Sequence, residues 1–281
     1  MGRSRGKHLA DGLRSRAAQL WFGVGSALPR TVEVVESGRT HRFVCHNLEE
    51  YARAKSLTYK EPGTYRWLDR EFGVGDVFYD IGANIGVYTL PAAARVGDEG
   101  RVVAFEPHVA NTASLLRNVA ANGYENRVTV ISSALDSRDG FFPFRYSDWG
   151  SGSAMSQLDA SVDTFGNPLA HVAVELKHAT TIDSLLAAGA IPAATHVKID
   201  VDGNELRVLE GMLGLLGSGT DAVRTLQVEV NLEEREELLA FMKGLDYDLS
   251  ERHYSQSGES MLAGGLSADE VPFNAVFTPR Q

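Results

Sequence analysis

The stretch Asp80-Ile81-Gly82-Ala83-Asn84-Ile85-Gly86 decides the fold, because it joins a short apolar run, residues 77–81, to a segment with helical spacing, residues 85–95. Glycines at a strand-to-helix turn let the backbone turn tightly and approach a ligand, and the N-terminus of the helix presents unpaired N–H groups. Similar runs alternate through the rest of the chain. This alternation predicts an α/β fold, in which helices cover both faces of a mostly parallel sheet.

The pattern outside this turn predicts the other elements and divides the chain. Further strands are predicted at 101–106, 128–132, 195–201 and 225–230, near 247–249 and at 273–278, and further helices at 110–122, 204–213 and 233–239. Residues 31–75 are predicted to form a hairpin (31–36 and 40–46) and two helices (48–57 and 62–72) ahead of a core at 76–281. Residues 137–179 lack a regular period, so we expect an irregular insertion there, and its aromatic side chains favour a lid or a substrate wall.

Two acids beside the glycine turn indicate the ligand. Asn84 replaces the middle glycine of the dinucleotide fingerprint, the position that clears space for a pyrophosphate. Asp80 would repel a pyrophosphate, but it suits a ligand with an ammonium and a sulfonium group, such as S-adenosylmethionine (SAM). Glu106 ends the next predicted strand and can accept hydrogen bonds from both ribose hydroxyls of such a ligand. A tight turn with solvated acids is the alternative.

Three ordered motifs resemble the FkbM family of SAM-dependent methyltransferases. They are Val77-Phe78-Tyr79-Asp80-Ile81-Gly82-Ala83-Asn84-Ile85-Gly86, Ala104-Phe105-Glu106-Pro107 and Lys198-Ile199-Asp200-Val201-Asp202-Gly203-Asn204-Glu205. The similarity runs from about residue 59 to residue 277 and departs from the family pattern at Asp202, where Glu is more common. It implies the class I methyltransferase fold, a Rossmann-like sheet of seven mostly parallel strands with a last antiparallel strand.

The same resemblance implies where SAM binds, over the ends of the strands. The methionine part is expected beside Asp80, Gly82, Ala83 and Asn84, the ribose on Glu106, and the adenine beside Ser133 and Ala134. Gly86 and Pro107, which belong to the same two turns, complete the predicted cofactor-binding set.

Charged side chains on two buried strands predict the catalytic residues. Residues two apart on a strand share a face, so 195–201 and 225–230 each have one polar face. Central strands of a parallel sheet are normally apolar on both faces, and two such departures indicate function. The predicted catalytic residues are Lys198, Asp200 and Glu229: one carboxylate takes the proton of an attacking hydroxyl or orients it, and the lysine holds a carboxylate in place. A purely structural ion pair is the alternative.

Other groups near these strands offer different chemistry. The alternative bases are His171, His178 and His253, although a loop histidine is more often only solvated. The side chains of Asp200, Asp202, Glu229 and Asn231 are all hard oxygen ligands, so a divalent metal is an alternative. No spacing requires it, and we predict no metal site.

Composition limits the class of protein. The chain has 281 residues, of which 43% are hydrophobic and 23% charged, as in globular proteins, and its single cysteine, Cys45, excludes a disulfide framework. No apolar run approaches the roughly 18 residues of a membrane span. The net charge of −10 argues against nucleic acid as a partner. Residues 1–30 nevertheless carry six basic residues and one acid, and this basic leader is predicted to be helical or disordered, with a peripheral membrane contact as the alternative.

These observations predict a cytoplasmic SAM-dependent methyltransferase that transfers a methyl group in line to a hydroxyl of a small molecule or glycan. The alternatives are a nicotinamide-dependent oxidoreductase on a similar sheet and a SAM-binding protein without catalytic activity. No oligomeric state is predicted.

Overall fold

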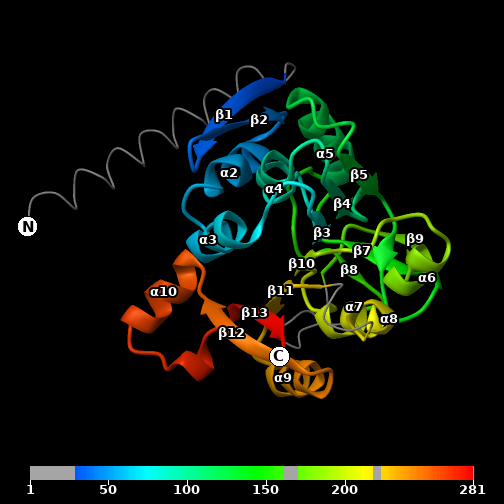
Figure 1. Ribbon diagram of the computed structural model, residues 1–281. Coiled ribbons are helices and arrows are strands. Elements are labelled where there is room, and N and C mark those ends of the chain that lie inside the picture. Colours follow the sequence, from blue (N-terminus) through cyan, green and yellow to red (C-terminus); the bar gives the residue numbers. More distant parts are fainter. Residues whose placement is uncertain (1–28, 161–169, 218–222, 281) are drawn as a thin grey trace, which may run out of the picture.

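A seven-stranded sheet forms the centre of the protein (Figure 1). The computed structural model describes residues 29–160, 170–217 and 223–280. The strand order is β12-β13-β11-β10-β3-β4-β5, and β13 runs antiparallel to both of its neighbours while the other pairs are parallel. The strands are β3 (Val77–Ile81), β4 (Arg101–Phe105), β5 (Val128–Ile131), β10 (His196–Ile199), β11 (Thr225–Val230), β12 (Tyr247–His253) and β13 (Phe273–Pro279). The predicted class I sheet, including its antiparallel strand, is confirmed.

Apolar layers cover both faces of this sheet. Val102 and Ala104 of β4 belong to one buried apolar cluster, whereas Val103 and Phe105 belong to another, because successive side chains of a strand point to opposite faces. The first cluster includes α2 (Leu48–Ser56), α3 (Pro62–Glu71), α4 (Thr89–Val96), α5 (Val109–Ala121) and the hairpin of β1 (Arg30–Glu36) and β2 (Arg39–Cys45). The second includes α6 (Ile182–Ala187), α7 (Glu205–Glu210), α8 (Leu213–Leu216) and α9 (Arg235–Gly244).

Several predicted helices have different bounds in the structure, and α9, predicted at 233–239, extends to Gly244. The helix predicted from residue 85 begins at Thr89, because Asn84 (φ 51°) and Gly86 (φ 96°) have left-handed backbone that no α-helix contains. The helix predicted at 204–213 is divided into α7 and α8 near Gly211. At Gly211 a Cβ atom would lie 2.1 Å from the carbonyl oxygen of Asp136, so the chain passes another backbone too closely for any side chain there.

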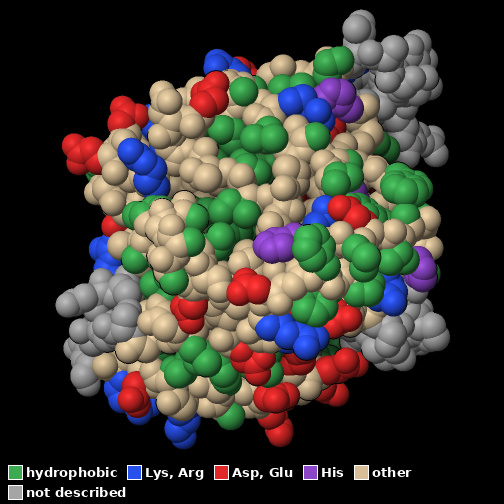
Figure 2. All heavy atoms as spheres, turned by 90° about the vertical axis from the view of Figure 1, so that its right-hand side faces the viewer, with side chains coloured by type: hydrophobic (Ala, Val, Ile, Leu, Met, Phe, Trp, Pro, Cys, Tyr) green, Lys and Arg blue, Asp and Glu red, His purple; other side chains and the backbone are tan. Residues whose placement is uncertain are grey.

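The prediction of an irregular insertion at 137–179 is wrong where three strands cross the described part of that stretch. Strand β7 (Gly140–Tyr146) pairs along its whole length with β9 (Ala173–Thr180), and with β6 (Ala134–Leu135) and β8 (Gln157–Leu158) they form a second sheet of four strands. Pro143 obscured this, because proline usually argues against a strand. Figure 2 shows the side of the molecule that carries these strands, where apolar side chains interrupt the charged surface; Phe141 and Leu176 are both exposed.

The remaining predictions concern the two ends of the chain and its division into parts. Most of the basic leader, residues 1–28, lies outside the described residues. The division of the core from residues 31–75 stays a prediction, although α2 and α3 share an apolar cluster with α4 and α5. Between β12 and β13 lie two elements that were not predicted, α10 (Gln256–Ala263) and a 3-10 turn, Ala268–Glu270. Within the described ranges, no helix combines the length and apolar character needed to cross a membrane.

Candidate active site

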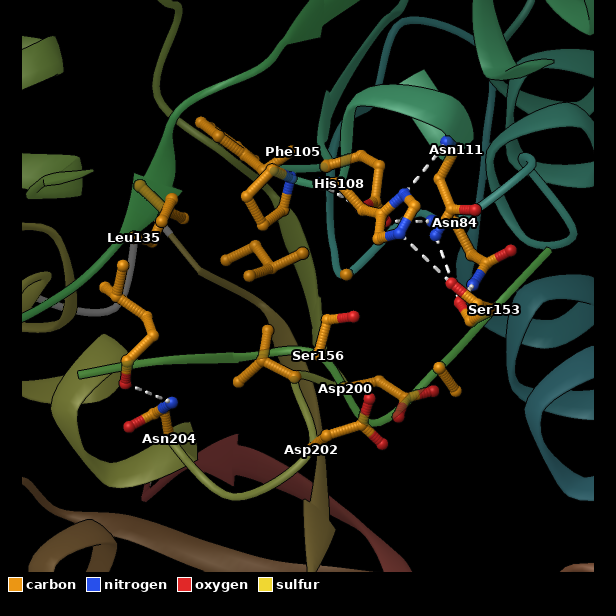
Figure 3. A pocket seen from close by; sticks show the side chains of 18 of the residues that line it. Asn84, Phe105, His108, Asn111, Leu135, Ser153, Ser156, Asp200, Asp202 and Asn204 are labelled. Carbon is orange, nitrogen blue, oxygen red and sulfur yellow. Dashed lines mark hydrogen bonds between the residues drawn. The ribbon is translucent and has the colours of Figure 1, made fainter. Parts of the chain in front are cut away.

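A pocket lies at the carboxyl ends of β3, β4, β10 and β11, the edge at which open α/β sheets bind ligands (Figure 3). The structure brings together there most of the residues predicted from the sequence. Those lining the pocket are Gly82, Asn84, Glu106, Pro107, Ser133, Ala134, Asp200 and Glu229. The others, Asp80, Ala83, Gly86 and Lys198, are not among its lining residues.

The glycine turn is fixed by contacts with two strands. The backbone N–H groups of Gly82 and Ala83 both donate to the carbonyl oxygen of Phe105, at 3.0 Å each. Gly82 has a φ of 85°, and a Cβ atom on it would lie 1.8 Å from the carbonyl oxygen of Asp200. Only glycine fits this position, so the turn places its backbone directly beside the end of β10.

Glu106 connects the turn to α5 through its carboxylate. Its Oε2 accepts a hydrogen bond from the backbone N–H of Asn84, and its Oε1 accepts one from that of His108, both at 2.7 Å. Burial raises the pKa of Glu106 to about 7, although these donors and Asn111 act in the opposite direction. The carboxyl group therefore titrates near neutral pH at the wall of the pocket.

Asp80 lies behind the turn rather than in the pocket. Its side chain is 1% exposed and accepts a hydrogen bond from the hydroxyl of Thr89 at the start of α4. Burial raises the pKa of Asp80 to about 6. In this arrangement Asp80 supports the turn and contributes negative charge from behind it.

Lys198 and Asp200 form a close ion pair. The Lys198 ammonium lies 2.6 Å from Oδ2 of Asp200 and 4.4 Å from the ring centroid of Tyr88, whose hydroxyl donates to Glu61 at 2.6 Å. Burial favours the neutral form of both partners, but the pair overcomes it: the pKa of Lys198 is raised and the pKa of Asp200 is lowered. Asp200 is thus an ionised carboxylate, and its side chain is 27% exposed.

Glu229 has the opposite protonation preference. Burial raises its pKa well above the ordinary value, and the negative charges of Asp200, Glu205 and Asp202 raise it further. The pKa of Asp202 is also raised, first by burial and then by Asp200. The pKa values of Asp200 and Glu229 are therefore shifted in opposite directions, as in sites that separate a proton acceptor from a proton donor.

The predicted histidines lie away from this acid pair. His253 is buried on β12, where it contacts Gln227 and Glu251, and His178 lies on the second sheet near Ser133, 3.3 Å from its hydroxyl. Neither they nor His171 line the pocket. The histidine that does is His108, which sequence reasoning missed. Its position directly after Glu106-Pro107 was the available signal, since it caps α5 and so faces the same edge of the sheet.

A segment of the predicted insertion crosses the pocket, as Figure 3 shows for Ser153 and Ser156. The carbonyl oxygen of Ser153 accepts hydrogen bonds from the side-chain amides of Asn84 (2.8 Å) and Asn111 (3.1 Å). Further along, the N–H of Met155 donates to Oδ2 of Asp202 at 2.7 Å. We call residues 150–156 the strap, because they connect the glycine turn to the end of β10.

Metal binding was an open alternative for the acids at this edge. In the described ranges, no group of three or more histidine, cysteine, aspartate or glutamate side chains has the geometry to hold a metal ion. The carboxylate of Asp200 instead pairs with the ammonium of Lys198, and the carboxylate of Asp202 accepts a hydrogen bond from the backbone of the strap.

The sheet order, with a glycine turn after β3 and a buried acid after β4, defines the Rossmann-like fold of class I methyltransferases. Residues 80–249 match the family model described as the Methyltransferase FkbM domain, and the chain belongs to this family. It is therefore a methyltransferase, and this result decides against the nicotinamide-dependent oxidoreductase.

The individual proteins to which this chain is similar share a low sequence identity with it. The hexuronic acid methyltransferase AglP of Haloferax volcanii is 26% identical over 227 residues, which cover 79% of this chain and 86% of that protein. A methyltransferase FkbM structure from Methylobacillus flagellatus is 18% identical, with a TM-score of 0.48, over 74% of this chain and 44% of the other. A putative rRNA-methylase structure from Clostridium thermocellum is 14% identical, also with a TM-score of 0.48, over 78% of this chain and 95% of the other.

Proposed function

We propose that this protein is a cytoplasmic SAM-dependent O-methyltransferase that methylates a hydroxyl group of a sugar, in a small molecule or a glycan. The observation that carries the proposal is the shared pocket, in which the glycine turn and Glu106 lie beside the acid pair Asp200 and Glu229. The similarity to a hexuronic acid methyltransferase supports a sugar as the acceptor.

The residues present fit SAM. Gly82 lines the pocket with its backbone, and Glu106 offers a buried carboxylate suited to two ribose hydroxyls. Ser133 and Ala134 are available for the adenine, and the acids at the ends of β10 and β11 suit a cationic ligand. When bound, SAM supplies an electrophilic methyl group on its sulfonium.

The protein's part in the reaction is to position the acceptor and remove its proton. Asp200, ionised beside Lys198, is the base that accepts the hydroxyl proton, and Lys198 is a positioning residue that keeps this carboxylate charged. Glu229, whose pKa is raised by burial and by the neighbouring acids, donates a hydrogen bond that orients the acceptor. The strap limits access of water to the same pocket, since it crosses from Asn84 to Asp202.

Calorimetry with SAM and with NAD+ tests the cofactor, and mass spectrometry after incubation with isotope-labelled SAM and sugar acceptors tests the reaction. We expect SAM to bind, NAD+ not to bind, and the labelled methyl group to appear on an oxygen. Binding of NAD+ without SAM, or transfer to nitrogen or carbon only, would contradict the proposal.

A further inference from the structure

The pocket contains two permanent positive charges that the proposed chemistry does not use. Among its lining residues in the described part of the chain, only Arg53 and Lys60 are lysine or arginine, whereas Glu106, Asp200, Asp202 and Glu229 are acids. Both cations come from outside the sheet: Arg53 lies in the last turn of α2, and Lys60 in the connection between α2 and α3.

Most of the N–H groups of the Arg53 guanidinium are available to a ligand. Its Nε donates to the carbonyl oxygen of Gly152 in the strap, and among the described residues no carboxylate forms an ion pair with it. The two terminal nitrogens of the guanidinium, which carry the paired N–H groups, have no partner within the described residues. Its side chain is neither fully buried nor free in solvent, so a ligand in the pocket can reach it.

Lys60 is placed to act together with Arg53. Its ammonium lies 3.4 Å from Glu61, and half of its side chain is exposed. Both cations act on the same acids: they help to lower the pKa of Asp200, where burial acts in the opposite direction and Lys198 has the larger effect. Among the described residues, no hydrogen bond or ion pair joins either cation to Asp200, and all three residues line the pocket.

Building on the proposed function, we infer that Arg53 and Lys60 bind a carboxylate of the acceptor, which is therefore a uronic acid rather than a neutral sugar. A guanidinium presents paired N–H groups that match the two oxygens of a carboxylate, and such charge-assisted pairs are about twice as strong as neutral hydrogen bonds. Without these cations, the ionised carboxylate of Asp200 at the wall of the pocket would repel an anionic acceptor. The two cations offset this repulsion within the same pocket.

The test measures binding of matched sugars rather than turnover alone. The protein is saturated with S-adenosylhomocysteine, and the methyl glycosides of glucuronic and galacturonic acid are titrated against those of glucose and galactose. We expect at least one uronic acid to bind about tenfold or more tightly than its neutral counterpart. Arg53→Gln is expected to bring the two affinities to within about twofold, and Lys60→Gln to reduce the ratio by a smaller factor.

The ratio of affinities separates recognition from structure. If Arg53 only held Gly152, Arg53→Gln would weaken both sugars equally and leave the ratio unchanged, which would overturn the inference. Lys55→Gln removes a positive charge from the same turn of α2 but not from the pocket, and we expect it to leave the ratio unchanged.

Other outcomes also decide the question. Equal affinities for acidic and neutral sugars, or no binding of either while S-adenosylhomocysteine binds, would overturn the inference and leave the cofactor assignment intact. Competition by uridine diphosphate that depends on Arg53 would assign the cations to phosphate and would likewise overturn it. Failure of S-adenosylhomocysteine to bind would instead contradict the proposed function.

Discussion

The ammonium of Lys198 lies 2.6 Å from the carboxylate of Asp200, and Lys198 itself is 1% exposed. A lysine so deeply buried keeps its charge only because acids surround it, and Asp200 keeps its charge because of the lysine. This mutual dependence lowers the pKa of Asp200, whereas burial and the neighbouring acids raise the pKa of Glu229.

Replacing Asp200 with asparagine should remove the base but leave the cofactor site. We expect Asp200→Asn to lower kcat by about 10²- to 10⁴-fold, the usual contribution of a general base, with little change in SAM affinity. Steady-state kinetics and calorimetry on the same preparation measure the two effects. Asp246→Asn, on an exposed turn, is the control, and full activity of Asp200→Asn would show that the assignment is wrong.

Lys198→Met should reveal the positioning role of the lysine. Loss of one partner of a buried ion pair costs about 3–5 kcal/mol in the free energy of unfolding, which urea denaturation measures. Because Asp200 then loses the charge that lowers its pKa, we expect the acidic limb of the activity profile to move to higher pH. Lys243→Met, on an exposed face of α9, should change neither quantity. A destabilised enzyme with an unshifted profile would mean that Lys198 has only a structural role.

Gly82→Ala should distort the cofactor site. The added Cβ would lie 1.8 Å from the carbonyl oxygen of Asp200, at a residue whose φ is 85°. We expect a loss of more than about 2 kcal/mol in the free energy of unfolding and loss of detectable SAM binding. Gly123→Ala is the matched control, since its φ is 69° but a Cβ there meets open space. It should cost only about 1 kcal/mol of strain and leave SAM affinity unchanged, and equal effects of the two variants would contradict the close-contact argument.

The affinity for SAM should fall as the pH falls through about 7. Burial raises the pKa of Glu106 to about 7, whereas the ionised carboxylate is the form that accepts two ribose hydroxyl hydrogen bonds. Below pH 7 a proton must leave before SAM binds, so we expect the affinity to decrease by up to about tenfold per pH unit. Calorimetry between pH 5.5 and 8.5 tests this, and Glu106→Gln should bind weakly with a flatter dependence. A steep dependence retained in Glu106→Gln would assign the titration to another group.

The same pKa also affects stability, with a defined sign. A folded-state pKa above the unfolded value means that the folded protein holds the proton more tightly, so raising the pH from 4.5 towards 7 lowers the free energy of unfolding. The contribution of Glu106 is of the order of 3 kcal/mol across this window. Thermal unfolding of Glu106→Gln should show a smaller loss of stability over the same range. An identical loss in the variant and the wild type would mean that Glu106 does not titrate there.

The sequence by itself determined the sheet and the cofactor turn of this methyltransferase. The positions of Gly82 and Glu106 could be predicted from short stretches of sequence. A left-handed turn between a strand and a helix requires glycine, and Glu106 directly follows the five residues of β4. Alternating apolar residues likewise fixed most strand positions. The prediction of an irregular insertion at 137–179 failed because β7 and β9 are stabilised by pairing with each other, and the sequence of neither strand indicates this pairing by itself.

Only the tertiary structure decided which side chains share the pocket. Strand register places Asp80 and Lys198 beside each other but behind the pocket wall, whereas Asp200 reaches it. His108 and the strap enter through the packing of α5 and the second sheet, and Arg53 through α2, far away in sequence. Contacts between these residues depend on how separate layers of the fold pack together. No local sequence pattern encodes which residues become neighbours in this way. The chemistry of the cofactor turn could thus be predicted from short motifs, while the charge facing the acceptor is set by the fold.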